Sequence, residues 1–466
     1  MKHQQPIHRR VSPAERMFTR SPFSVVAMFA RVHGDISSDL FSSAVGNLQE
    51  RHAQLRVRLE DDHEHVPWMT STDVGELFVE VRARDTERDW VALYDEQCRI
   101  PFVFEKEPAV RFFLLRGEGV SDILIFCHHI LCDGLSLAYL MRDLLTCLGE
   151  PSAQLASLPQ AAPVSRETIP DDVSINFLVR WILNRTNKKW HKQPFYLDQE
   201  DYEVLHEAYW SQTAHKMLTI HLTEAETTAL VERCRGEGVT VNSALGAAAL
   251  YAQESVGGML PVQPQLAVAA SLRERMKEAP GESMGFFAGV VEVDRPVDVH
   301  RPFWEQVSVL HERLQSSYTN KNLFLDFLLW CHLDPAILES RICKTHGDLV
   351  APDAPQFERL HSFAEAQDLV WKLLKRRGME RRENVVMGTA LTNLGRLDIP
   401  QEYGPLRLER MWMNPGGAFP LAMVHMVVGA VTCAGKLSIL LEYAEERCTT
   451  ERMEQIKEEM RGFLLG

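Results

Sequence analysis

The sequence predicts an α/β protein, because short apolar stretches of strand character alternate with longer stretches whose apolar residues recur at helical spacing. The alternation is clear in the first 150 residues and returns in the second half without obvious sequence similarity. The strand candidates lie at residues 23–32, 110–116, 122–126, 215–222, 266–271, 286–293 and 385–392. The helix candidates lie at residues 39–48, 135–148, 173–190, 223 onward, 241–254, 302–318 and 363–376.

Local signals mark where several of these elements begin and end. Ser38 is placed to cap the helix at residues 39–48. Thr223 and Glu226 form a Thr-x-x-Glu capping box at the start of the helix that begins at residue 223. Glycines at residues 117 and 119 separate two strands as a turn would. The apolar stretch at 419–434 is shorter than the roughly 20 residues of a membrane-spanning helix. We predict that it belongs to a β-hairpin continuing through 437–443.

The length of the chain predicts two lobes, since 466 residues exceed what one hydrophobic core normally serves. Residues 151–170 are rich in Pro, Ala and Ser, a composition typical of a linker. We therefore expect an N-terminal lobe over residues 1–150, a linker and crossover helix over 151–214, and a C-terminal lobe over 215–466.

The composition indicates a cytoplasmic globular protein, with 45% hydrophobic and 24% charged residues. A formal net charge of −14 argues against a general nucleic-acid binder, which normally carries a basic face. The nine cysteines show no CxxC spacing, as expected of reduced thiols. The polar N-terminus lacks the apolar segment of a secretory signal. We expect no membrane span and no bound metal or cofactor.

One short stretch carries the strongest functional signal: residues 125–134 read IFCHHILCDG. A buried strand ends at the two histidines and a helix starts near Leu135, so the histidines lie at a strand end, where α/β sheets bind ligands. Neighbouring side chains in a strand point to opposite faces, so His128 and His129 cannot share one task. One neutral imidazole suffices as the base in acyl transfer from a thioester, because a thiolate (pKa about 8.5) leaves unaided. We assign His129 as that base and His128 as a buried support.

Three other interpretations fit the same stretch. The histidines could be ordinary core residues, with Asp133 only capping the helix. Cys127, His128, His129 and Cys132 could bind zinc, although strand alternation separates them. Gly134 and Ser136 nearly match the G-x-S-x-G turn of serine hydrolases, with Ala in place of the last Gly.

Residues 128–134 resemble the HHxxxDG motif of the chloramphenicol-acetyltransferase-like superfamily, which includes condensation domains, plant BAHD acyltransferases, alcohol acetyltransferases and polyketide-associated acyltransferases. Residues 51–56 look like the RHxxLR motif of condensation domains, and residues 101–111, with Pro108 and Arg111, resemble the stretch leading to the histidine strand. Residues 271–275 with 285–289 are similar to a later substrate-tunnel segment, and residues 392–396 resemble the S/T-N-x-G motif. Residues 413–417 read MNPGG where many relatives carry DFGWG, which favours the polyketide-associated or alcohol-acyltransferase branch.

The resemblance implies two chloramphenicol-acetyltransferase-like lobes in a V-shaped pseudo-dimer with a tunnel between them. It implies His129 as general base, Gly134 beside it and Asp133 in a structural ion pair, for which we name Arg56. Asn393 and Thr392 become candidates for positioning substrate or the oxyanion.

The predicted reaction moves an acyl group from coenzyme A or a carrier-protein phosphopantetheine to a hydroxyl or amine, without an acyl-enzyme, in the biosynthesis of polyketides or nonribosomal peptides. The partners would be a small acceptor molecule and an acyl carrier protein. A basic run that includes Arg376, Arg377 and Arg381 could meet donor phosphates, or could simply be a solvated helix end. The alternatives are a non-catalytic module that binds carrier proteins and a serine hydrolase using Ser136.

Overall fold

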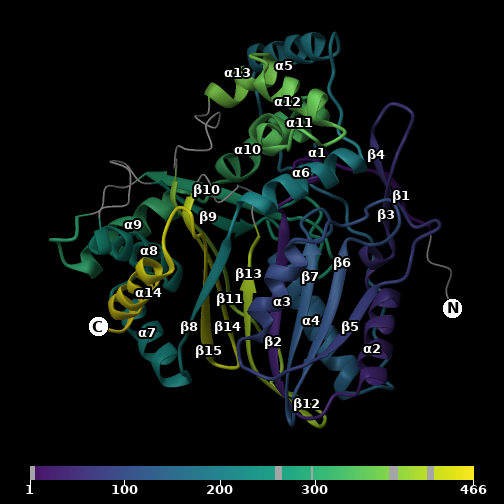
Figure 1. Cartoon of the computed structure of the whole chain (residues 1–466). Helices are drawn as coiled ribbons and strands as arrows, with labels where there is room; N and C mark the ends of the chain where they lie inside the picture. Colours follow the sequence, from purple (N-terminus) through teal and green to yellow (C-terminus); the bar gives the residue numbers. More distant parts are fainter. Residues whose placement is uncertain (1–5, 258–264, 295–297, 377–386, 417–423) are drawn as a thin grey trace.

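Figure 1 shows the computed structural model of the chain, in which residues 6–257, 265–294, 298–376, 387–416 and 424–466 are described. Two six-stranded sheets stand beside each other, each with helices packed against it, and a group of shorter helices lies across one end of both (Figure 1). The predicted α/β class with two lobes is confirmed. Among the described residues, every helix is too short or too polar to cross a bilayer.

The first sheet has the strand order β12-β13-β2-β7-β6-β5. Its strands are β2 Val25–His33, β5 Phe78–Ala83, β6 Val110–Arg116, β7 Val120–His128, β12 Glu402–Tyr403 and β13 Leu406–Asn414. β2 and β7 are antiparallel at its centre, with Val25 opposite His128. They are buried almost throughout, which explains their continuous apolar sequences. The associated helices are α2 Ser38–Arg51, α3 Asp89–Cys98 and α4 Gly134–Gly149.

The second sheet has the order β10-β9-β11-β14-β15-β8. Its strands are β8 His215–His221, β9 Gln265–Ser271, β10 Ala288–Asp294, β11 Met387–Arg396, β14 Val424–Cys433 and β15 Lys436–Ala444. The predicted hairpin is confirmed, since β14 and β15 are antiparallel neighbours. The helices on this side are α7 Glu224–Gly236, α8 Val241–Gly257, α9 Phe303–Ser317 and α14 Thr450–Leu465.

A helical cap lies over the ends of the two sheets (Figure 1). Its members are α1 Pro13–Arg16, α5 Phe177–Trp190, α6 Gln199–Gln212, α10 Asn320–Trp330, α11 Pro335–His346, α12 Phe357–Glu365 and α13 Leu369–Arg376, with the 3-10 turn η2 Gly347–Leu349. A small sheet on the first lobe has the strand order β1 His8–Arg10, β4 Pro67–Thr70 and β3 Arg58–Asp61; β3 and β4 follow the 3-10 turn η1 Ala53–Arg56 in the chain.

Three sequence predictions need correction. The helix expected at residues 363–376 is in fact the end of α12 and the whole of α13. The backbone of Ala366 is extended, which ends α12, and the side chain of Asp368 accepts a hydrogen bond from Trp371 N in the first turn of α13. The cap of α2 is Ser37, whose side chain accepts from Leu40 N, and not Ser38.

The third correction concerns the lobe boundary at residue 215. Strands β12 and β13 lie in residues 215–466 but complete the first sheet, with Asn414 opposite Ala27 of β2. The outer edge of buried β2 needs hydrogen-bond partners, and hydrophobic periodicity cannot say which strand supplies them.

Candidate active site

The site is built by the tight connection between β7 and α4. β7 ends at His128, and Asp133 caps α4 by accepting hydrogen bonds from Ser136 N at 2.7 Å and Ser136 Oγ at 2.8 Å. The backbone of His129 is tied to the start of β2, because its N–H donates to Ser24 O at 2.9 Å. The predicted strand end and helix start are therefore both confirmed. The turn between them has little freedom.

His128 is fully buried, and its hydrogen bonds define its protonation. Its Nδ1 accepts from Ile130 N at 3.4 Å, and its Nε2 faces the carbonyl of Ser21 at 3.2 Å, so the neutral ring carries its proton on Nε2. Burial lowers the pKa of His128 to about 3. The edge of the ring also meets Phe104. The ring is thus buried beneath the turn, and its role as a structural support stays a prediction.

His129 faces the other way and is 8% exposed. Its Nδ1 lies 3.1 Å from the Cys132 carbonyl and its Nε2 lies 3.2 Å from the Pro415 carbonyl. Phe18 stacks on the ring at 4.7 Å, and Phe286 meets it edge-on at 5.4 Å. Burial lowers the pKa of His129, so the ring is neutral at pH 7.

A neutral imidazole has one N–H, whereas a carbonyl oxygen only accepts hydrogen bonds. The ring of His129 therefore cannot satisfy both carbonyls. With the proton on Nδ1 and donated to Cys132, the lone pair of Nε2 points at the Pro415 oxygen. A hydroxyl or amine entering between them could donate to Nε2, which is the contact that a general base requires.

An apolar cavity of about 90 Å³ opens beside His129. Small and aliphatic residues on β9, β10, β11, β13 and β14 form most of its wall. These are Ala267, Ala269, Ala288, Val290, Ala390, Leu391, Met413, Val424 and Val427. Alternate residues of β9 and of β10 line it, so their alanines leave space above one face of the second sheet. The cavity is suited to an aliphatic group with one end at His129.

The predicted ion pair between Asp133 and Arg56 is wrong. Arg273 is the partner: its Nη2 lies 3.0 Å from Asp133 Oδ1 and 3.2 Å from Oδ2, and both side chains are buried. Arg273 Nη1 donates to the carbonyls of Gly281 and Ser283, and Asp133 Oδ2 accepts from Phe287 N. Asp133 thus joins the two lobes beside the base. Arg56 ends the turn η1, where its Nε has no partner among the described side chains.

Ser136 is fully buried inside the cap of α4 and does not meet an imidazole. Its single hydroxyl proton lies between Asp133 Oδ1 at 2.8 Å and Gly285 O at 3.0 Å, and its Oγ accepts from Arg273 Nη2 at 2.9 Å. This geometry argues against a nucleophilic serine. Gly134 lines the cavity, and a Cβ there would lie 2.9 Å from Leu394 Cδ2, so glycine permits a close approach to β11.

The other predicted site residues are only partly brought together. Thr392 lines the cavity, whereas Asn393 points away in β11 and its Oδ1 accepts from Gly395 N at 2.8 Å. Asn393 is therefore not placed to meet an oxyanion in the cavity. Arg376 ends α13, and Arg377 and Arg381 lie outside the described residues.

The thiols of the proposed zinc set do not converge with the histidines. Cys127 Sγ and Cys132 Sγ both lie near the backbone carbonyl of His128, at 3.6 and 3.7 Å. In the described part of the chain, no group of three or more His, Cys, Asp or Glu side chains is arranged to hold a metal ion.

Two further arginine motifs are structural. Arg51 and His52 both contact Asp143 of α4, and Arg51 also pairs with Glu282 at 3.0 Å. Arg111 donates to the carbonyls of Ile100 and Pro101. Sequence reasoning missed the roles of Phe18, Phe286 and Arg273. Arg273 and Phe286 carried a signal, because both lie in the two stretches that resemble the tunnel segment, whereas Phe18 carried none.

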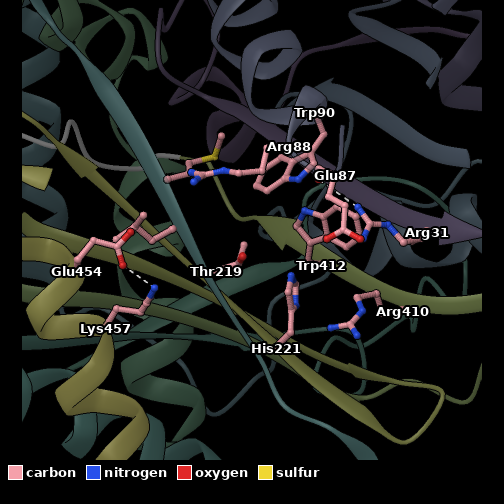
Figure 2. Close-up of a pocket in the computed structure, with 12 residues that line it drawn as sticks. Arg31, Glu87, Arg88, Trp90, Thr219, His221, Arg410, Trp412, Glu454 and Lys457 are labelled. Carbon is pink, nitrogen blue, oxygen red and sulfur yellow. Dashed lines mark hydrogen bonds and ion pairs between the residues drawn. The ribbon is translucent and has the colours of Figure 1, made fainter. Parts of the chain in front are cut away.

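A second cavity of about 190 Å³ has Trp412 among its lining residues (Figure 2). Trp412 lines it, whereas the adjacent Met413 lines the cavity of His129, so β13 divides the two. Charged residues line it: Arg31 and Arg410 lie near the edge contact of His221 with Trp412, and Lys457 lies with Glu454 on the other side of the pocket (Figure 2). Burial, with the nearby cations, lowers the pKa of His221 to about 4.

Residues 4–159 match the Condensation domain family. The chain is 36% identical over 138 residues to the nonribosomal peptide synthetase agiA of Aspergillus flavus, covering 28% of this chain and 2% of that protein. It is 30% identical over 132 residues to a polyketide synthase-nonribosomal peptide synthetase of Aspergillus clavatus, covering 28% of this chain and 3% of that protein. The chain thus spans only a small part of the length of these relatives.

Solved structures align over nearly the whole chain. A trichothecene 15-O-acetyltransferase from Fusarium sporotrichioides has a TM-score of 0.64 at 12% identity, covering 99% of this chain and 95% of its own. The polyketide synthase associated protein 5 of Mycobacterium tuberculosis has a TM-score of 0.59 at 15% identity, covering 98% and 97%. The first condensation domain of the CDA synthetase has a TM-score of 0.61 at 12% identity, covering 98% and 95%. The fold is shared with condensation domains and with these enzymes.

Proposed function

We propose, starting from its confirmed resemblance to the chloramphenicol-acetyltransferase-like superfamily, that this protein is an acyltransferase of natural-product biosynthesis. It would transfer an acyl group from a thioester of coenzyme A or a carrier protein to a hydroxyl or amine. The observation that supports this proposal best is the position of His129 at a strand end, where it lines an apolar cavity and its Nε2 lies 3.2 Å from the Pro415 carbonyl, which can only accept hydrogen bonds.

In the proposed step, the acceptor donates its proton to His129 Nε2 as its oxygen or nitrogen attacks the thioester carbon. The carbonyl double bond opens to an oxyanion, which then re-forms the bond and expels the thiolate. The proton on the imidazolium passes to the departing sulfur, so the ring returns to its neutral form. The hydrogen bond to the Cys132 carbonyl would hold the ring with its proton on Nδ1, so that the lone pair of Nε2 can accept the proton of the acceptor.

The wall of the cavity supports an aliphatic acyl group. Alanines at 267, 269, 288 and 390 leave room where larger side chains would fill the space. Each buried methylene contributes roughly 0.8 kcal/mol, so an apolar channel of this kind favours longer acyl chains. We propose Thr392, whose hydroxyl belongs to a cavity-lining residue, as the side chain that orients the thioester.

Product analysis with acyl-CoA and acyl-carrier donors against alcohols and amines tests the proposal. His129→Ala should lower turnover by about 10²- to 10⁴-fold, the usual share of a general base, while the unfolding midpoint stays near that of the wild type. His129→Gln, which keeps polarity and approximate size, is the matched second variant. Near-normal rates in both variants would refute the assignment of the base.

The second candidate is a non-catalytic module that binds carrier proteins, which the match to the condensation-domain family favours. Capture of a loaded carrier with no product from any acceptor would support it. The serine-hydrolase alternative has little structural support, because Ser136 Oγ is buried in the helix cap.

A further inference from the structure

Helix α5 is fixed to the helical cap by one face. Trp190, 3% exposed, packs with Ala336, Ile337 and Val370 of α11 and α13. The side chain of Asn187 donates to His332 O and accepts from Asp334 N, both at 2.9 Å. The helix therefore presents its remaining surface in a fixed orientation at the outer end of the cap (Figure 1).

The opposite face carries large apolar side chains in solvent. Phe177 is 86% exposed, Trp181 56%, Leu178 52% and Ile182 45%. They cluster on the first two turns, at the spacing that places residues on one side of a helix. Four of the ten large hydrophobic residues that are exposed in the described chain thus lie within six positions. Such a cluster marks an interaction site.

The surroundings of this cluster are basic, although the whole chain has a net charge of −14. The sequence contains neither Asp nor Glu between residues 173 and 197. Exposed cations lie on the same helix, directly after its end and on the neighbouring helix α13. They are Arg180, Arg185, Lys188, Lys189, Lys192, Lys372 and Lys375. The Arg185 guanidinium lies 5.7 Å above the Trp181 ring, so this charge borders the apolar cluster directly.

We propose that α5 is a membrane-surface anchor that inserts Phe177, Leu178, Trp181 and Ile182 into the headgroup region of an anionic phospholipid bilayer. Aromatic and aliphatic residues on one part of a helix with Lys and Arg beside them are the composition of interfacial helices. The cations meet lipid phosphates, while the overall negative charge keeps the rest of the protein away from the surface. The anchor would bring an acyltransferase to membrane-bound acceptors or acyl chains, and it does not depend on the proposed reaction.

Co-sedimentation of the full chain with vesicles tests the anchor. The wild type should pellet with phosphatidylcholine vesicles that contain about one third phosphatidylglycerol and be released by high salt. It should stay in solution with phosphatidylcholine alone. Phe177→Ser with Trp181→Ser should reduce the bound fraction at least about tenfold, because two inserted rings are lost. Lys188→Gln with Lys189→Gln should weaken the partition coefficient about fivefold per charge.

Val231→Ser with Val309→Ser is the matched control, since these side chains are 38% and 39% exposed on α7 and α9, away from α5. This control should bind vesicles as the wild type does. Absence of binding to anionic vesicles, equal binding to neutral vesicles, or unchanged binding of the Phe177/Trp181 variant would each overturn the anchor. A wild-type dimer that the same variant converts to a monomer would overturn it too, in favour of a second copy of the chain on this face.

Discussion

Breaking the pair between Asp133 and Arg273 should destabilise the junction of the two lobes. Both residues are less than 5% exposed, and Arg273 Nη2 lies within 3.2 Å of both carboxylate oxygens. Removing one partner of a buried ion pair costs about 3–5 kcal/mol, because the other charge stays desolvated. Arg273→Met should cost more than Asp133→Asn, since Arg273 also holds the carbonyls of Gly281 and Ser283.

A double-mutant cycle measured by urea unfolding isolates the pair. We expect a coupling energy of about 2 kcal/mol between Asp133→Asn and Arg273→Met, in the range found for residues of one hydrogen-bonded network. The remaining donors to Asp133, which are Ser136 N, Ser136 Oγ and Phe287 N, keep the coupling below the full cost of either single change.

Arg56→Met supplies the control for this cycle, because Arg56 has the same chemistry but lies on η1. We expect its coupling with Asp133→Asn to stay within about 0.5 kcal/mol of zero. A coupling above about 1 kcal/mol for Arg56, or none for Arg273, would show that the described contacts do not hold Asp133 in solution.

The remaining predictions concern protonation, the cavity and the buried serine. Burial lowers the pKa of His129 below the ordinary value of 6.5, so kcat/KM for a soluble thioester should not yet have fallen by half at pH 6.5. The acid limb of the pH profile should have its midpoint below pH 6.5, and a midpoint at or above 6.5 would contradict the assignment of the base. His128 has a pKa of about 3 when folded and 6.5 when unfolded, so the unfolded chain takes up the extra proton. The free energy of unfolding should therefore fall by up to about 1.4 kcal/mol per pH unit below 6.5, and urea titrations of His128→Gln should show a shallower fall. Ala267→Phe or Ala390→Phe should lower kcat/KM for long acyl donors about fourfold per excluded methylene and spare acetyl donors, whereas an equal loss for all donors would refute an acyl channel. Ser136→Ala should retain most turnover, and a fluorophosphonate probe should not label Ser136 in the wild type.

The sequence contained enough information to locate the site, because the strand end and the helix cap that carry it lie within ten residues of each other. A buried strand that ends at His128 and a helix capped by Asp133 are local features, readable from apolar periodicity and from an N-cap. Strand alternation also predicted that the two histidines point to opposite sides: His128 is fully buried, whereas His129 lines the cavity. The two-lobed α/β class followed from the repeated alternation of strands and helices.

Tertiary structure decided which distant residues meet at that site. Arg273 lies 140 positions from Asp133, and a guanidinium at residue 56 has the same chemistry, so the sequence could not choose between them. Ala267 and Ala390 look like ordinary core alanines until their strands pair and leave space beside His129. Asn393 had the right residue type, but a turn to Gly395 uses its side-chain oxygen.

The sequence by itself therefore determined which reactive side chains stand together at residues 128–136, since a strand end and a helix cap set their order along the chain. Strand pairing over hundreds of residues determined the walls around that chemistry, including the placement of β13 in the first sheet. Long-range pairing is set by complementary surfaces and by unpaired backbone groups that need partners. Neither property is visible in a single stretch of chain.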